Sequence, residues 1–142
     1  MARATGTIPA VPGDGAAYLS KAREFLEAAE DAMARENHTA AVGNAVHATI
    51  SAADAVASAR LRARWKGEHP GAVEHVAAAG DEGKTCATSL RRVLPLKAEA
   101  EYDPAPVSRT KATAALRAAT QALEAAARVV EQVATAGKPP DP

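Results

Sequence analysis

Three polar residues, Asn44, His47 and Asp54, have types and spacings that could bind a ligand or transfer a proton. Asn44 precedes His47 by three residues and Asp54 follows it by seven, so on a helix the three side chains share a stripe beside an apolar face. A histidine inside a helix is more often a packing residue than a catalyst. A buried polar stripe also costs stability unless its hydrogen bonds are satisfied. The stripe is therefore a candidate ligand-binding feature.

A short basic segment follows these residues. Between residues 60 and 66 the chain holds four basic residues and no acidic one: Arg60, Arg62, Arg64 and Lys66. At a helix C-terminus such cations favour the helix dipole, and the alternative is a local patch for phosphate or RNA. The whole chain carries 17 basic and 17 acidic residues, with a formal net charge of zero. That balance argues against an obligate nucleic-acid binder of the strongly basic kind.

Residues 78–85, with the sequence AAGDEGKT, nearly match a phosphate-binding P-loop, but alanine replaces its first glycine. A true P-loop needs a strand before it and a helix after it, and the preceding residues have a helical pattern. We therefore expect no P-loop here. The weaker possibility of an anion at a glycine-flanked helix N-terminus stays open.

Metal ions and cofactors are not expected. The histidines lack the Glu-x-x-His and His-Glu-x-x-His spacings of metal-binding helices, and the pairs Glu68–His69 and Glu74–His75 are more typical of surface or capping residues. The single cysteine, Cys86, allows no intramolecular disulfide and fits a reducing compartment. No segment resembles a secretory signal or a transmembrane helix. We therefore expect a cytoplasmic protein with no membrane association.

The elements that must position these residues are helices. Alanine accounts for 39 of the 142 residues and aromatic residues for 3%, a composition that favours helices over strands. Apolar spacing predicts helices at about 16–36, 39–64, 72–79, 84–101 and 108–135. Pro95 is expected to kink or restart the fourth helix, and Ser108 to cap the last one. Trp65, at a turn between helices, is expected to cover one end of the core.

Short connections between long amphipathic helices favour an all-α, antiparallel up-and-down bundle of four to five helices. We expect this bundle to span residues 16–136. Proline and glycine residues at both ends of the chain predict a flexible, disordered leader at 1–15 and a tail at 137–142.

Taken together, these segments resemble the bacterial HEPN domain family over roughly residues 18–135. The resemblance rests on Tyr18-Leu19, Ala22, Phe25-Leu26, Ala29, Ala40-Ala41, Asn44-Ala45, His47-Ala48, Ile50, Ala52, Asp54-Ala55, His69, Leu90, Val93-Leu94, Lys97, Glu101-Tyr102 and Val107-Ser108. It implies a helical bundle that is often a homodimer. Members of the family are metal-independent ribonucleases in toxin–antitoxin and phage-defence systems, non-catalytic partners of small nucleotidyltransferases, or proteins that bind nucleotides or RNA.

The nuclease members carry an arginine and a histidine separated by four to six residues, usually at the start of the last helix. Arginine there stabilises phosphate charge, and histidine transfers a proton to or from the 2′-hydroxyl. In this chain no histidine follows Tyr102, and the matching spacings are Arg64 with His69 and Arg62 with His69. About one such match is expected by chance in a chain of this composition. The departure favours a HEPN-like domain without the usual nuclease centre.

The sequence and its resemblance thus predict a non-catalytic, homodimeric module of a defence or toxin–antitoxin type system, which binds a nucleotide, RNA or a partner such as a nucleotidyltransferase. The alternatives are a metal-independent ribonuclease that uses Arg64 and His69 as its catalytic pair, and a purely structural helical module. Lys97 and Tyr102 flank the expected irregularity at Pro95, where backbone often lines a site, although Tyr102 could instead anchor the linker. The candidate ligand-binding residues are Asn44, His47, Asp54, Lys97, Glu101 and Tyr102.

Overall fold

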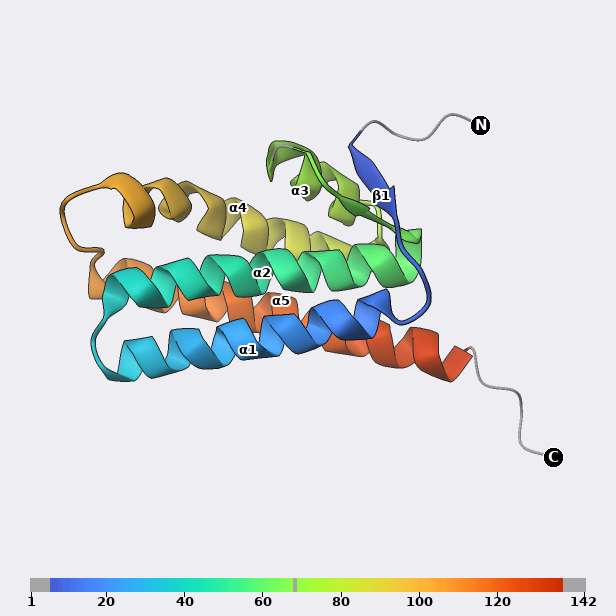
Figure 1. Cartoon of the computed structure of the whole chain (residues 1–142), viewed down its shortest axis with the longest axis horizontal. Helices are drawn as coiled ribbons and strands as arrows, with labels where there is room; N and C mark the ends of the chain where they lie inside the picture. The colour runs from blue at the N-terminus through green and yellow to red at the C-terminus, as the bar shows by residue number, and fades with distance from the viewer. Residues whose placement is uncertain (1–5, 68, 137–142) are drawn as a thin grey trace.

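The structure, a computed structural model, describes residues 6–67 and 69–136, apart from the side chain of His69. The described chain is an all-α bundle with a small two-stranded sheet at one end (Figure 1). Its elements, in chain order, are β1 (Thr7–Pro9), α1 (Asp14–Ala34), α2 (His38–Leu61), β2 (Ala63–Trp65), α3 (His69–Ala77), α4 (Gly80–Tyr102) and α5 (Arg109–Ala136). The expected all-α fold is confirmed, and none of these helices is both long enough and apolar enough to span a bilayer.

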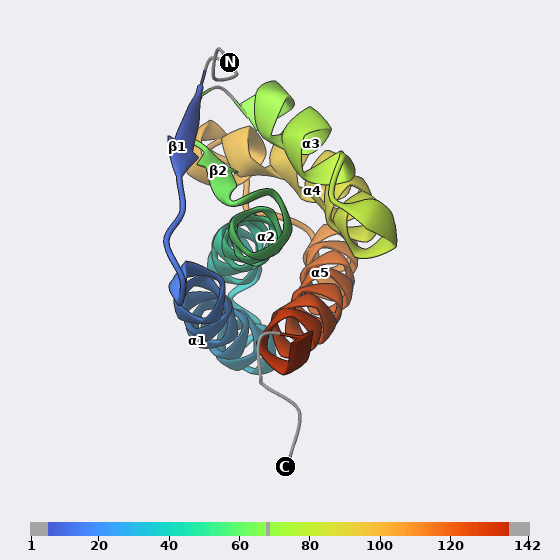
Figure 2. The same ribbon diagram turned by 90° about the vertical axis from the view of Figure 1, so that its right-hand side faces the viewer.

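Helix α2 is the centre of the bundle. Figure 2 shows it enclosed by α1, α4 and α5, and α3 lies outside against α4. Alanine, valine, serine and threonine account for all the buried residues of α2, and these occur around most of the helix. Small side chains let helices approach toward the close end of the usual range of about 8–10 Å. The alanine-rich composition thus explains how one helix is covered by three neighbours.

The buried side chains form two groups along the bundle. One group lies toward the sheet and includes Leu19, Val56, Val76, Leu90 and Val129. The other lies toward the opposite end and is built around Val42, Val46, Val93 and Val107 with many alanines. Among the described residues, Leu90 has the largest side chain that is fully buried. The first group supports the pocket described below.

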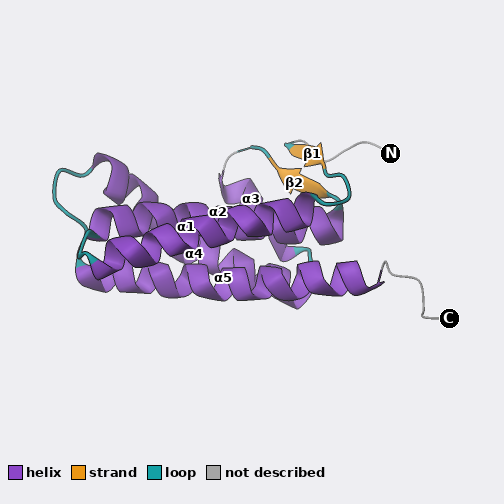
Figure 3. Cartoon of the chain, turned by 60° about the horizontal axis from the view of Figure 1, so that its bottom comes forward, coloured by secondary structure: helices purple, strands orange, loops and turns teal. Residues whose placement is uncertain are grey.

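Strands β1 and β2 pair antiparallel at the end of α2, as Figure 3 shows. Arg62 adopts a left-handed conformation with φ of 55° and ends α2 at Leu61, earlier than the expected end near residue 64. The chain then runs back along Thr7–Pro9, with Ile8 opposite Arg64. Hydrogen bonds from Lys66 N to Gly6 O (2.7 Å) and from Ala10 N to Arg62 O (2.9 Å) extend the pairing.

The ends of the chain differ in part from the expected leader and tail. Residues 7–9 form β1, and α1 begins at Asp14, inside the segment 1–15 that was expected to be a flexible leader. Hydrogen bonding to β2 provides the order that the local sequence does not indicate. Residues 1–5 and the expected tail at 137–142 lie outside the described residues.

Helix α4 continues through Pro95 to Tyr102, so the expected restart at this proline is wrong. The ring of Pro95 is exposed, while Leu94 and Leu96 pack against the core on either side of it. This packing compensates for the hydrogen bond that a proline removes from a helix. The expected capping of the last helix is confirmed, because the hydroxyl of Ser108 accepts a hydrogen bond from Lys111 N at 3.2 Å.

Candidate functional site

A pocket of about 400 Å³ lies at the sheet end of the bundle, between α2, β2 and α3. We call it the Asp54 pocket. Apolar side chains from five elements meet one acidic, one imidazole and two basic side chains there. Its lining residues are Ile8, Ile50, Ala53, Asp54, Ala57, Arg64, Trp65, Lys66, Gly67, Ala72, His75, Val76 and Leu90. Its size and mixed lining are those of a small-molecule site.

Asp54 is the acidic group of this pocket and projects from the buried middle of α2. Burial raises the pKa of its carboxyl group from 3.8 to about 6, while the positive charges of Arg64 and Lys21 oppose that rise. Within the described part of the chain, no group donates a hydrogen bond to the Asp54 carboxylate or forms a direct ion pair with it. An ionised carboxylate only accepts hydrogen bonds. Asp54 therefore offers its oxygens to a donor that comes from outside the chain.

Arg64 supplies positive charge on the β2 wall of the pocket. Its guanidinium carbon lies 5.8 Å from the centre of the Tyr18 ring, a cation–π contact that orients the side chain. Burial raises the pKa of the Tyr18 hydroxyl, and the nearby charge of Arg64 opposes this. Lys66, two residues further along, is exposed beside the same pocket. The mouth of the pocket is thus basic although the whole chain is neutral.

The Trp65 ring forms an aromatic wall because three glycines leave room for it. A Cβ built on Gly67 would lie 3.1 Å from the indole, and one on Gly6, whose φ is +92°, would lie 2.9 Å from it. A Cβ on Gly71 would overlap the ring outright. These glycines belong to the segments before β1, after β2 and within α3. Together they fix the position of Trp65.

His75 of α3 holds the other side of the aromatic wall. Its ring centre lies 5.9 Å from that of Trp65, and its Nε2 lies 2.7 Å from the carbonyl oxygen of Ala63. Because a carbonyl only accepts hydrogen bonds, Nε2 carries the proton and donates it. His75 therefore ties α3 to β2 behind the pocket. Sequence reasoning did not select His75 or Trp65 as ligand-binding residues, although the glycines around Trp65 were a usable signal.

The structure brings together two of the residues selected from the sequence, Asp54 and Arg64, in one pocket. It does not extend that site to Asn44 or His47. The Asn44 amide donates to the carbonyl of Ala40 at 3.0 Å, and the exposed His47 ring lies 5.1 Å from that of Phe25. Both residues lie nearer the other end of α2.

The remaining selected residues lie elsewhere. Lys97, Glu101 and Tyr102 belong to the C-terminal end of α4, at the opposite end of the bundle from the sheet (Figure 1). Tyr102 is 79% exposed. His69 is the first residue of α3, and its side chain lies outside the described part of the chain.

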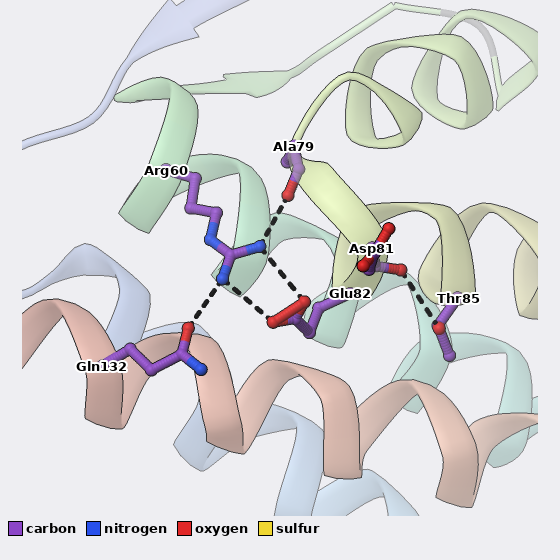
Figure 4. A network of polar contacts seen from close by, with 6 residues as sticks. All are labelled: Arg60, Ala79, Asp81, Glu82, Thr85 and Gln132. Carbon is purple, nitrogen blue, oxygen red and sulfur yellow. Dashed lines mark hydrogen bonds and ion pairs between the residues drawn. The ribbon is translucent and has the colours of Figure 1, made fainter.

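The P-loop-like segment has a structural role at the start of α4. It follows helix α3 rather than a strand, and Figure 4 shows its contacts. Glu82 accepts two hydrogen bonds from the Arg60 guanidinium, at 3.0 and 3.3 Å. The same guanidinium donates to the carbonyl of Ala79 at 2.8 Å and to the side chain of Gln132 at 2.7 Å. A carboxylate of the chain itself thus occupies this helix N-terminus, where an external anion could otherwise bind.

Replacing Arg60 by methionine is expected to lower the melting temperature clearly and to weaken the response to acid. The Arg60 hydrogen bonds hold the pKa of Glu82 below its ordinary value. The stabilisation is therefore present above the pKa of the unfolded chain and is lost as the pH falls through the lower folded-state pKa. Thermal melting from about pH 7 to about pH 3 measures both effects.

Arg109→Met is the matched control for this prediction. Arg109 pairs with Glu36 at 3.4 Å, but both side chains are 71% exposed, against 26% and 15% for Arg60 and Glu82. Exposed ion pairs contribute little to stability. Equal losses of melting temperature in the two variants would contradict a structural role for Arg60.

The sequence matches no protein-family model and no curated protein.

Proposed function

We propose that this chain is a HEPN-like helical module that binds a nucleotide in the Asp54 pocket without transforming it. The observation that carries the proposal is the meeting of Asp54, Trp65 and Arg64 around one pocket. They offer a hydrogen-bond acceptor, an aromatic wall and a cation, which match the base edge, base face and phosphate of a nucleotide. By its resemblance to the HEPN family, the module would act in the cytoplasm as a homodimer, beside a nucleotidyltransferase-type partner.

The base is proposed to bind between Asp54 and Trp65. Asp54 carries two acceptor oxygens without a donor from the described chain. Guanine presents two neighbouring N–H groups on one edge, which fit the two oxygens of a carboxylate better than the single amino group of adenine does. An aromatic side chain beside a base contributes about 1–3 kcal/mol by stacking. These groups favour a guanine nucleotide.

The phosphate is proposed to bind at the basic mouth formed by Arg64 and Lys66. A guanidinium binds phosphate through two parallel hydrogen bonds, and the Tyr18 contact already restricts the Arg64 side chain. An ammonium group such as that of Lys66 adds a second point charge. The affinity should therefore fall when salt is added, because part of it is electrostatic.

Calorimetric titration with GMP, AMP, UMP and guanosine tests this proposal. GMP is expected to bind most tightly. Arg64→Gln should lower the affinity for GMP at least about tenfold and change the affinity for guanosine little. Arg91→Gln, at an exposed arginine of α4 that does not line the pocket, should bind GMP as the parent does. Equal affinities for all four compounds, or no heat of binding, would contradict the proposal.

Ribonuclease activity remains the alternative, with Arg64 and His69 as the pair that it requires. The observation that favours it is the neighbourhood of Arg64, where Asp54 has a pKa of about 6 and so exchanges its proton near neutral pH. Incubating RNA with the protein in a chelator separates the two functions. We expect intact RNA, and cleavage that both Arg64→Gln and His69→Ala abolish would replace the binding proposal with a catalytic one.

A further inference from the structure

A second pocket, of about 310 Å³, lies between the start of α1, the end of α2 and the end of α5. We call it the Ser58 pocket. Val11, Val130 and Val133 give it an apolar lining, and its polar side chains come from Ser58 and Arg62. The chain that leaves β1 forms one of its walls. Its lining residues are not shared with the Asp54 pocket.

The rim of the Ser58 pocket exposes large apolar side chains to solvent. Val11 is 64% exposed and Val133 is 43% exposed. Among the described residues, the other exposed large hydrophobic side chain is that of Tyr102, the last residue of α4, and this end of α4 lies at the opposite end of the bundle (Figure 1). Apolar side chains that gather around a concave surface are typical of a binding site. The rim thus favours a ligand with an apolar part.

Ser58 supplies a buried hydroxyl without a hydrogen-bond partner. The residue is 6% exposed, and its Oγ is buried with no partner in the described chain. Thr49 in the same helix differs, because its buried hydroxyl donates a hydrogen bond to the carbonyl of Ala45, four residues earlier, at 2.8 Å. A buried polar group without a partner is costly, and each such group needs an explanation. A ligand oxygen in this pocket would provide the missing acceptor.

Arg62 contributes the basic side chain of the same pocket. It follows Ser58 by four residues and lines the same pocket, and its left-handed φ of 55° ends α2 there. The backbone carbonyl of Arg62 accepts a hydrogen bond from Ala10 N, which holds this turn against the wall of the pocket. In the described chain its exposed guanidinium forms no ion pair. The pocket therefore combines an apolar lining with one cation and one hydroxyl donor.

We infer that the Ser58 pocket binds an aliphatic monocarboxylate. The alkyl chain would lie against Val11, Val130 and Val133, with the carboxylate on Arg62 and the Ser58 hydroxyl donating to it. One cation and one hydroxyl match a single negative charge better than a phosphate dianion. A volume near the lower end for small-molecule sites favours a medium-length chain.

Titration with octanoate and with octanol, followed by calorimetry, tests this inference. Octanoate is expected to bind more tightly than octanol. Arg62→Asn should lower the affinity for octanoate at least about tenfold without lowering the affinity for octanol. Asparagine is the suitable replacement because it tolerates the left-handed conformation. Ser58→Ala should weaken octanoate several-fold and raise the melting temperature of the free protein, because it removes an unsatisfied buried hydroxyl. Arg117→Gln, an exposed arginine of α5, is the control.

Three results would overturn the inference. The first is no saturable octanoate binding at millimolar concentration, and the second is equal octanoate affinity in Arg62→Asn and the parent. The third is a dimer in sedimentation that Val133→Glu dissociates while octanoate leaves it unchanged, because a second copy of the chain would then cover the pocket. None of these results depends on nucleotide binding, so the two sites are tested separately.

Discussion

Asp54→Asn is expected to raise the free energy of unfolding near pH 8 by about 3 kcal/mol, and to weaken GMP binding at least about tenfold. Burial raises the pKa of Asp54 from 3.8 to about 6, so the native state holds a proton that the unfolded chain releases more readily. At neutral pH the folded protein must carry a partly buried charge without a hydrogen-bond donor from the described chain. Asparagine removes that charge at nearly the same size. A gain in stability paired with a loss of binding is typical of a functional residue.

The contribution of Asp54 to the free energy of unfolding depends on pH, because its pKa differs between the folded and unfolded states. Below the unfolded pKa of 3.8, Asp54 is protonated in both states and costs nothing. As the pH rises from about 4 to about 6, the unfolded chain loses the proton first, so this group lowers the free energy of unfolding. Above about 6 the cost is constant. In Asp54→Asn the free energy of unfolding should not show the decrease that Asp54 causes between about pH 4 and about pH 6.

Urea denaturation of the parent and of Asp54→Asn across this pH range measures the effect. Asp31→Asn is the control, because Asp31 is exposed on α1 away from the pocket. The difference between Asp54→Asn and the parent should grow between about pH 4 and about pH 6 and then stay level. A difference that does not change with pH would show that the Asp54 carboxyl is not desolvated.

Gly71→Ala is expected to lower the free energy of unfolding by about 3 kcal/mol and to shift the fluorescence of Trp65. A Cβ at Gly71 would overlap the indole ring, which also lies against Gly6 and Gly67 and so cannot retreat without disturbing other segments. Trp65 is the one tryptophan in the sequence, so its fluorescence reports on this pocket directly. Displacement of the ring should also weaken GMP binding.

Gly43→Ala is the matched control for Gly71→Ala. Gly43 lies in α2, and a Cβ there would meet nothing within 4 Å. Alanine in a helix is more favourable than glycine by about 1 kcal/mol, so this variant should be more stable than the parent. Urea denaturation of both variants measures the contrast. Stabilisation by both alanines would mean that Trp65 does not pack against Gly71.

Much of the fold follows from local sequence. Alanine content and apolar spacing predict the long helices, and Asp103–Pro106 followed by Ser108 predicts the break before α5. The two strands could not be predicted in this way, because three residues are too few for an alternating pattern. They depend on the left-handed turn at Arg62 and on pairing between distant segments. The restart predicted at Pro95 was wrong for a similar reason, because packing of the neighbouring residues against the core outweighs the effect of the proline on the helix.

The candidate site was predictable only in part. Asp54 was selected for its helical spacing, and Arg64 as part of the basic segment at residues 60–66 and through the family resemblance. No sequence argument placed the two in one pocket. Their meeting depends on β2, which turns Arg64 back beside α2. Trp65 was expected only to cover the core, because its role depends on glycines that lie far apart in the sequence. The segment at residues 78–85 resembles a P-loop in composition, but its Glu82 pairs with Arg60 and so joins the start of α4 to α2.

Fluorescence of Trp65 during titration with GMP is the most direct test of nucleotide binding in the Asp54 pocket. Because the chain contains one tryptophan and its ring lines this pocket, any saturable change reports on the site itself. We predict a saturable change in the parent protein that needs at least about tenfold more GMP in Arg64→Gln and is unaltered in Arg91→Gln. If the emission stays constant up to millimolar GMP, or changes equally in all three proteins, the Asp54 pocket does not bind this nucleotide through Arg64.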